Sequence, residues 1–199
     1  MRKSIVLLAV VCMTMQAAFA AFELQGVQTY QEWDFNTPER PAPASYQDNE
    51  FATEPLLAEV SGSVFGGNLQ HSNGIWTDSS LKVTMGIPNN PVLNPYKIIE
   101  VEMRYQGQIM ESWVADIEGN DFPYSHLDRV IENCQDGWKV VKDVWEIRPN
   151  PYAEKLCYGL NGLGQTAALD YIHVHTRCVP EPATLGLISL GLMLVRRRK

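Results

Sequence analysis

The sequence lacks most of the features that would mark an enzyme, a zinc protein or a nucleic-acid-binding protein. It has no Gly-x-Ser-x-Gly, His-Glu-x-x-His or phosphate-loop motif, which argues against the enzyme classes that these motifs mark. Its four cysteines include no Cys-x-x-Cys pair, so a zinc knuckle is excluded. The 16 Lys and Arg residues are outnumbered by 23 Asp and Glu residues, and this balance argues against a nucleic-acid partner.

Long apolar runs are also missing, and the first of two short ones lies at the N-terminus. Residues 1–20 begin with two basic residues, continue through a mostly apolar stretch and end with Ala18-Phe19-Ala20. This small-x-small ending is the pattern that signal peptidase accepts. We therefore expect a signal peptide that signal peptidase removes after Ala20, and an exported mature chain.

The second short apolar run covers residues 183–195. As a helix it would span roughly 20 Å, which is shorter than a hydrocarbon core of about 30 Å. It is preceded by the motif Val179, Pro180, Glu181 and Pro182, and followed by the basic tail Arg196, Arg197, Arg198 and Lys199. The basic tail favours the cytoplasmic side, so the run would be a transient transmembrane segment in the inner membrane.

This three-part tail resembles the PEP-CTERM sorting signal of Gram-negative bacteria, and the resemblance is limited to residues 179–199. It implies that an exosortase, a membrane-embedded cysteine transpeptidase, recognises the tail and removes it near the Pro-Glu-Pro. It also implies a place at the cell surface or in the extracellular matrix, since proteins with this signal are typically linked to extracellular polysaccharide and biofilm. The resemblance says nothing about the rest of the chain.

Residues 21–178 have the length of one domain, and their pattern predicts an all-β fold. Apolar and polar residues alternate with period two in several segments, as in half-buried strands. Amphipathic crossover helices are missing, which favours an antiparallel β-sandwich of jelly-roll or lectin-like type over a parallel α/β sheet. We expect strands within 27–36, 80–89, 97–107, 109–119, 137–150, 154–162 and 169–179.

Three local features refine this expectation. A hairpin is the simplest connection between the strands at 97–105 and 109–117, because Gln106-Gly107-Gln108 separates them. Residues 125–137 predict one short helix, since their apolar residues are spaced as on one helical face. The Pro-rich stretch 36–45 predicts a stiff connection after the first strand.

Three cysteines remain after removal of the signal peptide, and in an oxidising compartment one disulfide is expected. Cys134 with Cys157 would close a modest loop and contribute roughly 3 kcal/mol. Cys157 with Cys178 is the rival pairing, and either choice leaves one thiol over.

Several polar and aromatic residues are candidates for a binding or catalytic site. His173 and His175 share one face of a predicted strand and could bind a metal, although no third ligand is identifiable. Glu100 and Glu102 could act as a glycosidase pair, but neighbouring acids on a strand are more often solvated surface. Most aromatic rings should lie in the core, and Trp76, in a loop-like stretch, is the best candidate for an exposed ligand contact.

The charge of the retained part limits the ligands and cofactors. Residues 21–182 hold all 23 acidic residues and 10 of the 16 basic residues, a balance of −13. No cofactor is expected, although the acidic surface offers oxygen ligands to calcium. We therefore expect a non-enzymatic exported protein that binds carbohydrate or has a structural role in the matrix, with a small secreted glycan-active enzyme as the alternative.

Overall fold

Two antiparallel β-sheets make up the part of the chain that the structure describes. The computed structural model describes residues 28–49, 51–52, 54, 56–63, 68–88, 96–116, 123–149, 151 and 153–179. Their elements are β1 (Gln28–Trp33), β2 (Ala42–Pro43), β3 (Tyr46–Asp48), β4 (Leu57–Ser61), β5 (Gln70–Ser72), β6 (Ile75–Asp78), β7 (Ser80–Pro88), β8 (Tyr96–Gln106), β9 (Gln108–Asp116), β10 (Tyr124–Asn133), the 3-10 helix η1 (Gln135–Gly137), β11 (Lys139–Ile147), β12 (Ala153–Asn161) and β13 (Ala167–Val179). The expected signal peptide and residues 180–199 of the tail lie outside this range.

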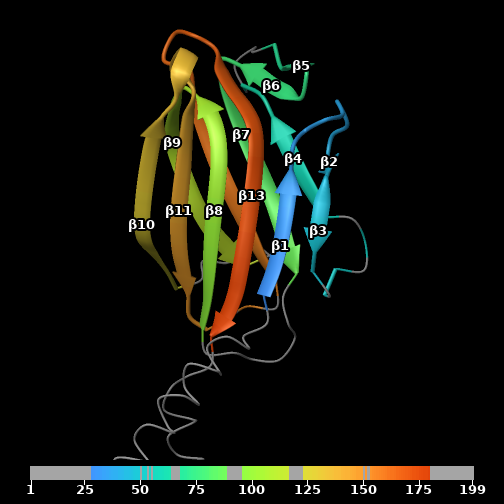
Figure 1. Cartoon of the computed structure of the whole chain (residues 1–199), viewed down its shortest axis with the longest axis vertical. Coiled ribbons are helices and arrows are strands. Elements are labelled where there is room, and N and C mark those ends of the chain that lie inside the picture. Colours follow the sequence, from blue (N-terminus) through green and yellow to red (C-terminus); the bar gives the residue numbers. More distant parts are fainter. Residues whose placement is uncertain are drawn as a thin grey trace, which may run out of the picture.

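The eight-stranded sheet has the order β10-β11-β8-β13-β1-β3, with β6 paired to β13 and β5 paired to β6. The five-stranded sheet has the order β2-β4-β7-β12-β9. Figure 1 shows β13 in red near the middle of the larger sheet, with β8 on one side and β1 on the other. The predicted all-β sandwich is therefore confirmed.

Period-two alternation explains which side chains fill the space between the sheets. In β8, Ile99, Val101, Met103 and Tyr105 are at most 2% exposed, while Glu100, Glu102 and Arg104 alternate with them. The inward residues of β7, β12 and β13 join the same core. The polar residues of β8 therefore point to the outer face of the larger sheet.

The connection at Gly107 differs from the expected hairpin. β8 belongs to the larger sheet and β9 to the smaller one, so the two strands do not pair and the chain crosses between the sheets. Gly107 has a φ of 103°, and a Cβ at this position would lie 2.6 Å from the carbonyl oxygen of Asn161. Only glycine fits this crossing without strain.

The helix expected at residues 125–137 is also wrong. This segment forms the edge strand β10 followed by η1. Leu127 is 52% exposed, and Val130 and Ile131 are each 46% exposed, so the apolar spacing that favoured a helix belongs to an open strand. Pairing along the whole of β11 decides the conformation in favour of a strand.

A buried polar cluster links the two sheets near this edge. The carboxylate of Asp143 accepts hydrogen bonds from Arg129 Nε and Nη2, both at 2.6 Å, and from the Tyr158 hydroxyl at 3.0 Å. His126 Nε2 lies 3.1 Å from the same carboxylate. Arg129 also donates to Ser112 Oγ on β9 at 2.7 Å, so one guanidinium joins β10, β11 and β9. The side chain of Asp143 is completely buried, and these partners stabilise its charge.

Candidate functional site

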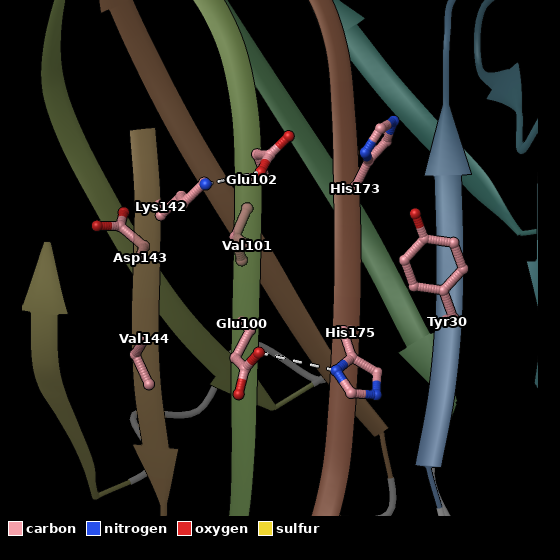
Figure 2. A pocket seen from close by; sticks show the side chains of 9 residues that line it. All are labelled: Tyr30, Glu100, Val101, Glu102, Lys142, Asp143, Val144, His173 and His175. Carbon is pink, nitrogen blue, oxygen red and sulfur yellow. Dashed lines mark ion pairs between the residues drawn. The ribbon is translucent and has the colours of Figure 1, made fainter. Parts of the chain in front are cut away.

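A pocket of about 320 Å³ opens on the outer face of the eight-stranded sheet. We call it the outer-face pocket. Figure 2 shows side chains from β1, β8, β11 and β13 around it. Its lining residues are Tyr30, Glu100, Val101, Glu102, Lys142, Asp143, Val144, His173 and His175.

Strand register brings these side chains together from distant parts of the sequence. His175 on β13 lies opposite Glu100 on β8 and opposite Tyr30 on β1. His173, two residues earlier on the same face, lies opposite Glu102. The predicted sharing of one face by the two histidines is confirmed, and each of them faces a carboxylate across the pair of strands.

The pocket carboxylates of Glu100 and Glu102 lie close to basic side chains. Glu100 Oε1 lies 3.4 Å from Arg177 Nη2, and its Oε2 lies 3.8 Å from His175 Nδ1. Glu102 Oε2 lies 3.6 Å from Lys142 Nζ. These side chains are partly exposed, so each pair contributes at most about 1 kcal/mol to stability. Their remaining oxygen lone pairs face solvent and can accept hydrogen bonds from a ligand.

Two tyrosine hydroxyls donate to carboxylates at this face. Tyr30 donates to Glu32 Oε1 at 2.5 Å, and Tyr171 donates to Glu102 Oε1 at 3.0 Å. Partial burial, followed by these hydrogen bonds, raises the pKa of each tyrosine to about 12. Both hydroxyls therefore stay protonated and hold the carboxylates in place at neutral pH.

Aromatic rings form a continuous row beside the acids. The rings of Tyr171 and His173 are stacked, with centroids 4.4 Å apart and planes inclined by 20°. The ring of Tyr30 lies 6.3 Å from His173, 6.4 Å from His175 and 6.1 Å from Tyr46. Tyr46, on β3, is 54% exposed and extends the row past the pocket. Rings of this kind present flat apolar surfaces next to hydrogen-bonding groups.

Comparison with known proteins identifies the C-terminal end of the chain. Residues 179–199 match the PEP-CTERM protein-sorting motif. The chain carries a PEP-CTERM sorting signal. This confirms the resemblance seen in the sequence, and it marks an exported, surface-directed protein with exosortase as its processing partner.

The remaining comparisons add little to the PEP-CTERM match. No curated protein matches the chain. Among solved structures, the chain is similar to the enzymatically active domain of bacteriophage CBA120 tailspike protein 4, at 10% identity and a TM-score of 0.26. That match takes in 59% of this chain and 17% of the phage chain, and it supports no inference about fold or function.

The transmembrane segment expected within the PEP-CTERM signal lies outside the described residues, as do the cleavage residues Ala18 and Ala20. Among the residues that are described, no helix has the length and apolar character needed to span a membrane. The described strand β13 ends at Val179, where the sorting motif begins.

Trp76 does not occupy the exposed position expected of it. It lies on β6, is 3% exposed, and packs against the ring of His71 at 4.7 Å between centroids. The expected loop is a short hairpin in which β5 and β6 pair around Asn73 and Gly74. This pairing explains the correction, because it places the indole on the buried face instead of at a loop tip.

The cysteines also differ from expectation. Cys134 is exposed between β10 and η1, whereas Cys157 is buried on β12 of the other sheet. Both are free thiols, which corrects the Cys134–Cys157 disulfide expected for an oxidising compartment. Burial raises the pKa of the Cys157 thiol, so this residue is poorly reactive in the folded protein.

The four histidines do not gather at one place. His71 Nε2 lies 2.6 Å from the carbonyl oxygen of Phe35, and His126 belongs to the buried cluster around Asp143. Within the described ranges, no group of three or more His, Cys, Asp or Glu side chains is arranged to hold a metal ion. The acids and imidazoles of the outer-face pocket are therefore spread along the sheet instead of converging on one point.

Proposed function

We propose that this exported protein binds polysaccharide through the outer-face pocket and catalyses no reaction there. The PEP-CTERM signal supports a role at the cell surface. The further step, to the extracellular matrix or biofilm of a Gram-negative bacterium, belongs to the same proposal. A ligand in this place would be an extracellular glycan.

The observation that carries the proposal is the combination of rings and carboxylates at one pocket. A pyranose ring has apolar faces, which pack on aromatic side chains, and hydroxyl groups, which donate to carboxylates. Tyr30 and His173 supply the rings, while Glu100 and Glu102 supply the acceptors. The pocket is open and lies on a rigid sheet, so the side chains are positioned before a ligand arrives.

A glycan-array screen followed by calorimetric titration tests this proposal. With a glycan that binds, Tyr30→Ala should weaken affinity about tenfold, because an aromatic contact contributes roughly 1 to 1.5 kcal/mol. Tyr30→Phe keeps the ring and should change affinity much less. Tyr124→Ala is the matched control, since Tyr124 is exposed on β10, the far edge of the sheet. Equal effects of Tyr30→Ala and Tyr124→Ala would contradict a site at the pocket.

The alternative is a small glycan-active enzyme, and one observation favours testing it. Glu100 and Glu102 both line the outer-face pocket, and glycosidases use two carboxyl groups about 5 to 9 Å apart. Incubation with the bound glycan should release no new reducing ends if the protein only binds. If the protein releases new reducing ends, and Glu100→Gln and Glu102→Gln each abolish this release, the enzymatic alternative is supported and the binding proposal is refuted.

A further inference from the structure

Three basic side chains at or beside the outer-face pocket each have an acid as partner. Three ion pairs account for them: Lys142 with Glu102, Arg177 with Glu100 and Arg104 with Asp170. Arg104 also lies over the ring of Trp138, with its guanidinium carbon 4.5 Å from the ring centroid. These three cations are therefore already engaged at short range, and a ligand with negative charge would have to displace the carboxylate partner of one of them.

Three acids lie next to Tyr30 and His173, just outside the pocket lining, and have no such match. Glu32 follows Tyr30 on the outer face of β1, Asp34 follows the end of β1, and Asp48 on β3 lies opposite Tyr30. Glu32 accepts from the Tyr30 hydroxyl, and Asp34 Oδ1 lies 3.7 Å from His173 Nε2. Among the described residues, none of the three has a Lys or Arg within ion-pair distance, so the surface beside the pocket at Tyr30 is negatively charged.

The arrangement of these acids suits an extended ligand. Among the described residues, no three His, Cys, Asp or Glu side chains are grouped closely enough to hold a metal ion, and the three acids are no exception. They alternate with rings, since Tyr46 lies opposite Glu32 and the Tyr30 and Tyr46 centroids are 6.1 Å apart. Apolar surfaces separated by single negative charges complement a chain of sugar rings that bear single positive charges.

We propose that the pocket selects glycans that carry free amino groups, such as partly deacetylated amino-sugar polymers, over neutral and uronic-acid glycans. This inference rests on the proposed binding function and adds the substrate class. An ammonium group can replace a water at Glu32, Asp34 or Asp48 and donate up to three hydrogen bonds. A uronate at the same place meets like charge and gains no free cation.

The experiment compares three oligosaccharide probes of equal length on the exported protein purified from a host that has an exosortase. The probes are a chitosan oligosaccharide, its fully N-acetylated form and an oligogalacturonate. We expect the chitosan probe to bind at least tenfold more tightly than the acetylated probe, and the galacturonate to bind most weakly. Added salt should reduce this preference, because the Debye length falls to about 3 Å at 1 M salt.

A pair of charge-matched variants separates the pocket from the acidic surface as a whole. The double variant Asp34→Asn with Asp48→Asn should lower the preference for the chitosan probe about tenfold. Each exposed charge contributes up to about fivefold to that preference. Glu59→Gln with Asp128→Asn removes the same charge from exposed positions on β4 and β10 and should preserve the preference. If both double variants lose it equally, the inference is overturned in favour of unspecific attraction.

The remaining outcomes distinguish the inference from the proposal beneath it. Equal affinity for the chitosan and acetylated probes, with both weakened by Tyr30→Ala, overturns the amino-sugar inference and leaves the binding site in place. Binding of no probe, together with no hit on a glycan array, overturns both.

Discussion

Replacement of Asp143 by Ala should destabilise the folded protein strongly. The change removes a fully buried carboxylate that receives two hydrogen bonds from Arg129, one from Tyr158 and a contact from His126. Arg129 would keep its charge without an acidic partner, and breaking a buried ion pair in this way costs about 3 to 5 kcal/mol. The side chain of Arg129 is 27% exposed, so water can reach it, and we place the loss at about 3 kcal/mol.

Urea denaturation and thermal unfolding of the exported protein measure this loss. For a domain of this size, about 3 kcal/mol corresponds to a fall in Tm of roughly 10 °C. Tyr158→Phe removes the hydrogen bond to Asp143 and the one accepted from Trp145 Nε1 but leaves the ion pair, so it should cost less, about 2 kcal/mol. Lys82→Ala is the control, because it breaks the exposed pair with Glu111 and should cost less than about 1 kcal/mol.

A result for Asp143→Ala close to that for Lys82→Ala would refute the reasoning. It would mean that the buried cluster is not a net stabilising link between β10, β11 and the five-stranded sheet. The urea dependence of unfolding should stay the same in all variants, so that midpoints can be compared directly.

Three further predictions concern pH, thiol chemistry and sorting. The pKa values of Tyr30 and Tyr171 are raised to about 12 from an unfolded value near 10. Their contribution to stability should therefore be complete below pH 10 and fall as pH rises through 12. Urea midpoints and phenolate absorbance across this pH range measure the loss. Cys134 should react with a thiol reagent in the native protein and Cys157 only after unfolding, and equally fast labelling of both would contradict the structure. Neutral residues in place of 196–199 should release unprocessed protein, and an intact mass that still includes this tail in the wild-type surface protein would contradict processing.

Strands such as β7 and β8 were predictable from the sequence because burial alternates along most of their length. The outward acids of β8 and the outward histidines of β13 follow directly from the period-two pattern. The same pattern could not show which strands are neighbours. Tyr30 meets His175 across a pairing of β1 with β13, and this pairing depends on tertiary packing far along the chain.

The errors have physical causes of a related kind. β8 and β9 are joined by a short turn typical of a hairpin, but Gly107 carries the chain from one sheet to the other. The apolar spacing of β10 fits one helical face equally well, and only its pairing with β11 decides between the two. Trp76 has the polar neighbours of a loop residue, yet a two-residue turn at Asn73 and Gly74 buries it. In each case the pairing of the strands, which the local pattern does not show, overrides a local signal.

The position of β13 has a mechanical consequence for a protein that is processed at its C-terminus. The strand ends at Val179, directly before the Pro-Glu-Pro, and it is paired with β8 on one side and with β1 on the other. Tension applied at that end would act along the strand axis, perpendicular to the inter-strand hydrogen bonds. All of these hydrogen bonds would then share the load at once, instead of breaking one after another. Since His173 and His175 lie on the same strand, a force between a glycan bound as proposed and an anchored C-terminus would pass along β13.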